Sequence, residues 1–221
     1  MVEIHEWMKM LRDKAQEEFG GRLKFLGLQG SYRRGEATEE SDIDVVLVVN
    51  QLSLNDLARY KALLKEMPEG EKACGFICGS EQLKHWPRYE LFQFEQDTKG
   101  YLGNLRALMP SFDEEDIRQS VSIHAANLYH TMTNGYLKGG TEQVLSAGYK
   151  QAFFLLQELC ARRGRPYAHT KLELATLLDG EDMRVLDVCM NWPALKSDLA
   201  ARADYYYELL INWAGEILNS L

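Results

Sequence analysis

A glycine-bounded turn followed by two closely spaced carboxylates is the feature that most constrains this sequence. The turn has the sequence GSYRRG at residues 30–35 and follows a short apolar run. A second apolar run at residues 43–49 is rich in β-branched residues, which is typical of a buried strand. Asp42 and Asp44 stand at its start, and because strand side chains alternate between faces, both are expected on the same face. The pattern therefore predicts a turn and an acidic pair at one edge of a sheet.

The chemistry of these residue types indicates a nucleotide site. Two neighbouring carboxylates repel each other unless a divalent cation lies between them, and Mg²⁺, which prefers hard oxygen ligands, suits Asp42 and Asp44. At the turn, Gly30 lets the backbone approach a phosphate, backbone N–H groups form an anion-binding nest, and the Ser31 hydroxyl adds a donor. Each half alone is common in ordinary turns and strand starts. Together they predict a site for a metal-bound nucleoside triphosphate.

The joined motif, GSxxRG followed by SDxD, resembles the signature of the DNA polymerase β-like nucleotidyltransferase superfamily. It is most similar to the small bacterial branch, which includes the minimal, aminoglycoside and lincosamide nucleotidyltransferases. The resemblance covers about the first half of the chain and places the family's loop arginine at Arg34. The nucleotide-binding residues that it implies are Gly30, Ser31, Arg34 and Ser41. It also implies that Asp42 and Asp44 bind Mg²⁺ and are catalytic.

The third predicted strand, residues 72–78, departs from the family pattern. Members of the family commonly place a third acidic residue on this strand, where it helps to bind the metal and acts as a base. The sequence from Lys72 to Gly79 is KACGFICG and contains no acid. The missing carboxylate must therefore come from elsewhere or be absent.

The stretch 86–101 offers candidates for that carboxylate and is expected to be a strand or an extended segment crossing the site. Its densest polar cluster, Asp97-Thr98-Lys99, precedes Gly100. Asp97 is therefore the first candidate for the third catalytic carboxylate, ahead of Glu90 and Glu95. Lys99 is expected to reach a phosphate. A solvated surface charge is the alternative for each of these residues.

Periodicity and breaker residues predict an α+β protein with two domains. Residues 1–110 are expected to form a nucleotidyltransferase α/β domain with a small mixed sheet, and residues 111–221 an all-helical bundle. The expected strands are 23–28, 43–49 and 72–78, and the expected helices are 2–19, 55–66, 113–135, 141–162, 170–179, 181–190 and 194–219. Predicted helix N-caps are Ser53 or Asn55, Ser111 or Asp113, and Thr141, and a stop is expected at Trp192-Pro193. Lys150, on the second bundle helix, is expected to face either the nucleotide or the solvent.

Composition limits the compartment and the partners. A net charge of −8 argues against a broad nucleic-acid-binding face. The N-terminus lacks the features of a signal peptide, and no apolar run approaches the length of a membrane span, so a cytoplasmic protein is expected. The four cysteines, Cys74, Cys78, Cys160 and Cys189, match no zinc pattern and are expected to be buried free thiols.

These observations predict a Mg²⁺-dependent transfer of a nucleoside monophosphate, AMP from ATP, to a hydroxyl group, with release of pyrophosphate. The expected acceptor is a small molecule, such as an aminoglycoside or a lincosamide, because an acidic surface suits a cationic compound. Two alternatives stay open: modification of a protein hydroxyl, and a nucleotide-binding regulator that has lost turnover because the third strand lacks its acid. The expected partners are the nucleoside triphosphate and the acceptor, with no membrane and no nucleic acid, and a homodimer is one option.

Overall fold

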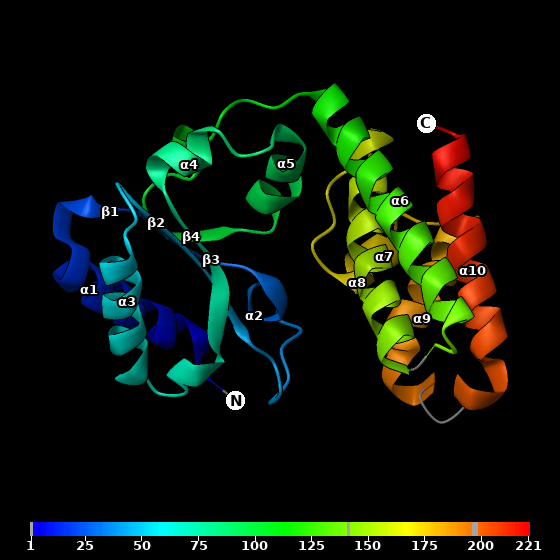
Figure 1. The fold of residues 1–221 in the computed structure, drawn as a ribbon, viewed down its shortest axis with the longest axis horizontal. Helices are drawn as coiled ribbons and strands as arrows, with labels where there is room; N and C mark the ends of the chain where they lie inside the picture. Colours follow the sequence, from blue (N-terminus) through cyan, green and yellow to red (C-terminus); the bar gives the residue numbers. More distant parts are fainter. Residues whose placement is uncertain (1, 141, 196–198) are drawn as a thin grey trace. The chain divides into compact units, whose positions relative to one another are not determined.

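A small mixed sheet organises the first half of the chain (Figure 1). Its strands are β1 (Leu23–Leu28), β2 (Ile43–Val49), β3 (Ala73–Gly79) and β4 (Lys99–Leu102), in the spatial order β3-β2-β1-β4. Strand β1 is antiparallel to β2 and to β4, whereas β2 is parallel to β3. The computed structural model describes residues 2–140, 142–195 and 199–221. It confirms the predicted α+β class, with a helical C-terminal region after a mixed sheet.

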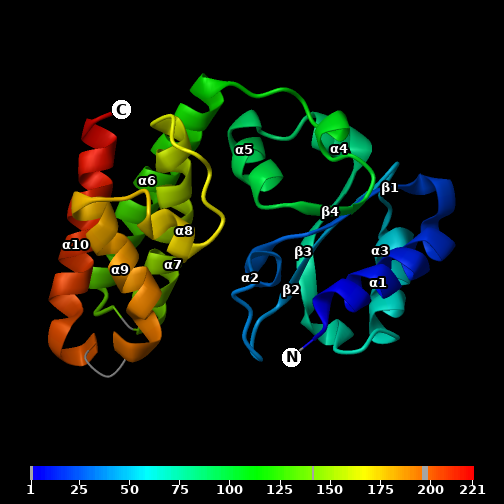
Figure 2. The same ribbon diagram turned by 180° about the vertical axis from the view of Figure 1, so that it is seen from behind.

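Alternate residues of β2 enter two different hydrophobic cores. Val45 and Leu47 are buried in the core that α1 (Ile4–Phe19) and α3 (Leu54–Lys65) share, whereas Val46 and Val48 are buried in the core that includes residues of α4 (Ser80–Lys84) and α5 (Arg88–Gln96). Figures 1 and 2 show these two helix pairs on opposite sides of the sheet. Because Asp44 has the parity of Val46, its side chain lies on the face that carries α4 and α5.

The chain divides into two compact units, Met1–Phe112 and Asp113–Leu221. The other elements of the first unit are η1 (Gly20–Arg22), α2 (Gly30–Arg34), η2 (Gly70–Lys72) and η3 (Arg106–Leu108). The second unit contains α6 (Glu114–Leu137), α7 (Glu142–Arg162), α8 (Lys171–Ala175), α9 (Gly180–Leu195) and α10 (Leu199–Asn219). Helix α6 packs on α7 and α10, and α7 packs on α9, around one apolar core.

Several helix starts lie at the residues that capping chemistry predicts. Ser53 caps α3 in a capping box with Asp56, and Asp113 caps α6 in a capping box with Asp116. Thr141, the third predicted cap, lies outside the described residues. No helix in the described part of the chain is long and apolar enough to cross a membrane.

Three predictions of secondary structure are wrong. The helix expected over residues 170–179 ends at Ala175. The stretch 86–101 was expected to be extended, but most of it is α5, and only its last residues belong to β4. Fully buried Leu91 holds α5 on the sheet, so tertiary packing decides its conformation. The stop expected at Trp192-Pro193 also fails, since α9 continues to Leu195. Pro193 cannot donate the backbone bond to the residue four positions before it, and the buried Trp192 holds this last turn on the core instead.

The Arg22–Asp56 ion pair makes the stability of the first unit sensitive to acid. Asp56 is 2% exposed, and its carboxylate accepts hydrogen bonds from Arg22 Nη1 and Nη2 at 2.8 and 2.7 Å. These bonds, together with those from Ser53, hold the pKa of Asp56 well below its ordinary value. A lowered pKa stabilises the folded state above about pH 4, the ordinary carboxyl range, and this contribution is lost as the pH falls. We expect Asp56→Asn to lower the melting temperature most at pH 7, and by progressively less as the pH falls below about 4 towards the lowered pKa of the folded state. A difference that stays constant over this range would contradict the assignment.

A fully buried carboxylate in the second unit depends on one histidine. Glu158 on α7 accepts hydrogen bonds from Ser120 Oγ and His124 Nδ1, each at 2.8 Å, and is 0% exposed. Removing His124 leaves this charge with less compensation, so we expect His124→Ala to lower the free energy of unfolding by about 2–3 kcal/mol. Adding Glu158→Leu to that variant should recover part of the loss, because an apolar side chain carries no desolvation penalty. Chemical denaturation of both variants measures this, and a double variant less stable than His124→Ala would contradict it.

Candidate active site

Gly30 and Asp44 are packed directly against each other. Gly30 opens α2 with a φ of +70°, a left-handed conformation that side chains rarely adopt. A Cβ atom on Gly30 would lie 1.9 Å from Asp44 Oδ2, so only glycine leaves room for the carboxylate. The backbone of Gln29 also donates to the Asp44 carbonyl at 2.8 Å. The fold thus brings the predicted phosphate turn and the predicted metal ligand into contact, and the turn is the start of a short helix.

Asp97 approaches the same glycine from α5. Its Oδ2 accepts the Gly30 N–H at 3.2 Å, and Arg34 Nη1 donates to Oδ1 and Oδ2 at 3.2 and 3.1 Å. The Arg34 and Asp97 side chains are only 7% and 10% exposed. Arg34 Nε also donates to Glu36 at 3.3 Å. The structure therefore brings together three of the predicted site residues, Gly30, Arg34 and Asp97, in one nearly buried cluster.

Asp42 and Ser41 lie at the entry to β2. Asp42 is exposed and directly precedes the strand, whereas Asp44 is half-buried within it. The Ser41 hydroxyl accepts the Thr38 N–H at 2.9 Å, and the Ser41 N–H donates to the Thr38 carbonyl at 3.1 Å. Ser41 thus closes the turn that delivers the two carboxylates, while its predicted contact with the nucleotide stays a prediction.

Strand β3 places a thiol beside the acidic pair. Cys74 pairs with Asp44 in the parallel register, and its Sγ donates to Asp44 Oδ1 at 3.5 Å. The prediction that all four cysteines are buried is therefore wrong for Cys74, which is exposed because β3 is an edge strand. Cys78, Cys160 and Cys189 are buried and free, and burial raises the pKa of Cys189 to about 12. No local pattern signals the contact between Cys74 and Asp44, because this contact depends on the register between β2 and β3.

The two predicted lysines have different surroundings. Lys99 is exposed at the start of β4 and pairs with Leu28, two residues before Gly30. Its Nζ lies 5.8 Å from the centre of the Tyr101 ring. Lys150 is exposed on α7 in the second unit. A role for either lysine in phosphate binding stays a prediction.

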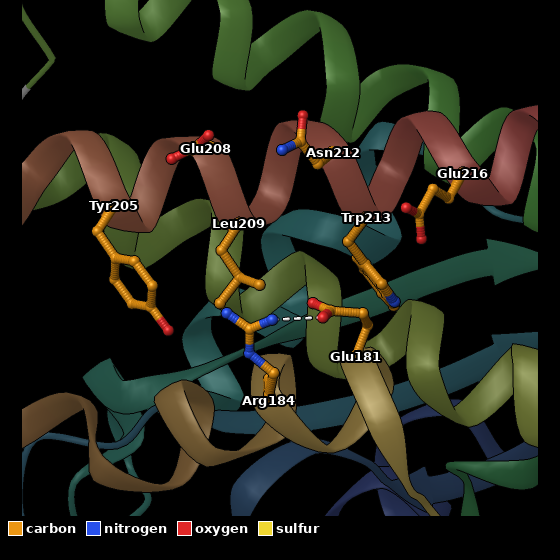
Figure 3. A pocket seen from close by; sticks show the side chains of 8 residues that line it. All are labelled: Glu181, Arg184, Tyr205, Glu208, Leu209, Asn212, Trp213 and Glu216. Atoms are coloured by element: carbon orange, nitrogen blue, oxygen red, sulfur yellow. Dashed lines mark hydrogen bonds and ion pairs between the residues drawn. The ribbon is translucent and has the colours of Figure 1, made fainter.

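A hollow of about 300 Å³ lies between α9 and α10 (Figure 3). Glu181 and Arg184 form an ion pair in it, and the Tyr205 and Trp213 rings line it. Trp213 Nε1 donates to Asp182 Oδ1 at 2.8 Å. None of the predicted site residues lines this hollow.

The donor set at the turn fits Mg²⁺. Asp42 and Asp44 offer hard carboxylate oxygens, and Mg²⁺ usually takes one or two carboxylates and completes its shell with waters and substrate phosphates. Across residues 2–140, 142–195 and 199–221, no group of three or more His, Cys, Asp or Glu side chains forms a complete metal cage. A side chain at Gly30 would displace the Asp44 carboxylate, so the glycine keeps this possible metal ligand in place. This arrangement suits an ion shared between the protein and a nucleotide.

The fold and the turn define a nucleotidyltransferase-type α/β unit, and comparisons with known proteins agree. A family model described as "Nucleotidyltransferase domain" matches residues 8–84. Two proteins of Methanocaldococcus jannaschii, each named "Putative protein adenylyltransferase", are similar in sequence. MJ0604 is 36% identical over 76 residues, which cover 31% of this chain and 72% of that protein. MJ1379 is 34% identical over 62 residues, which cover 28% of this chain and 56% of that protein.

This chain belongs to the nucleotidyltransferase domain family. The resemblance to nucleotidyltransferases and the predicted enzyme class are thereby confirmed. A crystal structure of the spectinomycin adenyltransferase AAD(9) from Enterococcus faecialis, with ATP and spectinomycin, has a similar fold. The similarity covers 97% of this chain and 99% of that one, with a TM-score of 0.56 and 14% sequence identity. At this identity the likeness shows the fold alone.

Proposed function

We propose that this protein transfers AMP from ATP to a hydroxyl group of a small molecule and needs Mg²⁺ to do so. The observation that carries the proposal is the contact between Gly30 and Asp44, because it joins the family's phosphate turn to a carboxylate suited to the metal. Asp42 and Asp44 would hold the ion. Bound there, Mg²⁺ would neutralise phosphate charge and favour departure of pyrophosphate.

The contributions of this chain's own residues are positioning and charge. Gly30, which has no side chain, would let a phosphate approach the backbone, and Ser31 would offer its backbone N–H and its hydroxyl. Ser41 bonds to Thr38 and so holds the turn before β2. This turn would fix the backbone that carries Asp42 and Asp44. Lys99 and Lys150 are proposed as further phosphate contacts. Holding the phosphate in line with an attacking hydroxyl accounts for much of the rate in transfers of this kind.

Two other functions compete with transfer to a small molecule. The names of the two archaeal relatives favour a protein hydroxyl as the acceptor. A regulator without turnover is favoured by β3, which carries Cys74 and no acid beside Asp44. The net charge of −8 supports a cationic small molecule, and the similar fold of an enzyme crystallised with spectinomycin supports the same class.

Incubation of the purified chain with α-³²P-labelled ATP and Mg²⁺ distinguishes these assignments. The acceptors are spectinomycin, other aminocyclitols and aminoglycosides, a lincosamide, and a bacterial protein extract. We expect label in a small product, with one pyrophosphate released for each product formed. Label that migrates with a protein band would instead support a protein acceptor. ATP binding without pyrophosphate release on any acceptor would support the regulator.

A further inference from the structure

The C-terminal end of α5 holds the phosphate turn through a set of contacts that we call the α5 clamp. The clamp joins residues 29–34 to residues 94–98. Gln29 Nε2 donates to Thr98 Oγ1 at 2.8 Å and to the Phe94 carbonyl at 3.2 Å. Arg33 Nη2 donates to the Gln96 carbonyl at 3.4 Å. The last carbonyls of a helix need donors from outside the helix, and the turn supplies them here.

Asp97 is the charged centre of the α5 clamp. It is the C-cap residue of α5, and its N–H donates to the Gln93 carbonyl at 2.9 Å, which fixes its backbone. Its two oxygens accept from Arg34, and Oδ2 also accepts the Gly30 N–H. Charge-assisted bonds of this kind are strong when both groups lie out of water, as these two do. Asp97 therefore binds the first and the last residue of α2 at once.

These contacts make Asp97 unsuited to binding a metal ion. Both of its oxygens accept from the Arg34 guanidinium, which also contacts Glu36, and a divalent cation on the same oxygens would lie beside that positive charge. Asp44 differs, because its Oδ1 accepts a weak S–H donor from Cys74, which a metal ion can replace at little cost. Of the two acids that flank Gly30, Asp44 is therefore available for a cation, whereas the oxygens of Asp97 already accept bonds from Arg34 and Gly30.

We propose that Asp97 is a positioning residue that fixes Gly30 and Arg34 from α5, and that it is not the third ligand of the metal. This inference rests on the proposed function, since it assigns a role within the same nucleotide site. Gly30 has a left-handed φ, which glycine alone does not enforce, because its backbone is free to adopt other conformations. Asp97 holds the N–H of Gly30, while Asp44 packs on its Cα side. The clamp would keep the turn ready for phosphate before the nucleotide arrives.

The test compares Asp97→Asn with Asp44→Asn by three measurements on the full chain. Hydrogen exchange reports the amides of residues 30–34, electron paramagnetic resonance reports the affinity for Mn²⁺ alone, and calorimetry reports the affinity for Mg²⁺ with a non-hydrolysable ATP analogue. We expect Asp97→Asn to speed exchange in the turn and to weaken nucleotide binding at least about tenfold, as misplacement of a binding group does. Its Mn²⁺ affinity should stay within about twofold of the wild type, whereas Asp44→Asn should lower it at least about tenfold.

Two further variants sharpen this test. The double variant Arg34→Gln/Asp97→Asn should have the same nucleotide affinity as whichever single variant binds less tightly. The two losses should not add, because both substitutions remove the same ion pair. Asp13→Asn is the matched control, since Asp13 pairs with Arg12 on the exposed side of α1 and lies outside the α5 clamp, and it should resemble the wild type.

Distinct results would overturn the proposal. A loss of Mn²⁺ affinity in Asp97→Asn equal to that in Asp44→Asn would make Asp97 a metal ligand. Unchanged exchange of residues 30–34 in Asp97→Asn would show that Asp97 does not position the turn. A wild-type chain that binds no nucleotide would contradict the proposed function instead, and the exchange data would still decide whether Asp97 holds the turn.

Discussion

Replacing Asp44 by asparagine is expected to reduce nucleotidyl transfer at least about 100-fold, with little change in stability. Asparagine keeps the shape of the side chain but removes the negative charge that would hold the metal beside Gly30. Because Asp44 is half-buried next to another acid, losing one charge should not destabilise the strand. Pyrophosphate release under saturating ATP and Mg²⁺ measures the effect, and thermal unfolding verifies the fold.

Asp13→Asn is the matched control for this substitution. Asp13 lies on the exposed side of α1 and pairs with Arg12 at 2.8 Å, a surface interaction of small energetic value. The same chemical change there should leave transfer at the wild-type rate. If Asp44→Asn retained more than about a tenth of the wild-type rate, the proposed metal-binding role of this carboxylate would be wrong.

Replacing Gly30 by alanine is expected to have the second large effect. The new Cβ atom would lie 1.9 Å from Asp44 Oδ2 and 2.7 Å from Asp44 Cγ, so the carboxylate must turn away. Positive φ adds about 1 kcal/mol of strain for a residue with a side chain. We expect the affinity for the Mg²⁺–nucleotide complex to fall at least about tenfold, because the metal ligand is displaced. Calorimetry with a non-hydrolysable ATP analogue measures this loss.

Gly164→Ala separates backbone strain from the clash with Asp44. Gly164 has a φ of +71°, nearly equal to that of Gly30, but a Cβ atom there meets nothing within 4 Å. The two variants should therefore lose similar backbone stability, while Gly164→Ala should bind the nucleotide as the wild type does. Equal nucleotide affinities in the two variants would argue against the steric role of Gly30.

Local signals in the sequence were sufficient for most of the fold. The β-branched run at residues 43–49 predicted β2, because β-branched side chains pack well on the pleated surface of a buried strand. Ser53 and Asp113 marked two helix starts, since their side chains satisfy N–H groups within three residues of themselves. The motif from Gly30 to Asp44 indicated the family for the same reason, because the residues of the motif lie close together along the chain.

Other features depended on packing that no local pattern contains. Residues 88–96 include Leu91, Phe92 and Phe94, whose spacing is also compatible with an extended segment. Leu91 is buried in the core that includes residues of α4 and α5, and this burial favours the helix. The exposure of Cys74 likewise follows from the position of β3 at the sheet edge, which depends on strand order.

The sequence by itself determined the turn, the acidic pair and the family, because these reside in neighbouring residues whose chemistry can be read directly. Only the tertiary structure decided what Asp97 contacts, since Gly30 and Asp97 are 67 positions apart in the chain. The sequence named Asp97 as a candidate third carboxylate, and the fold places it in an ion pair with Arg34. The physical reason is that the partner of a nearly buried charge is set by which elements pack together, and α5 packs against the sheet beside the turn.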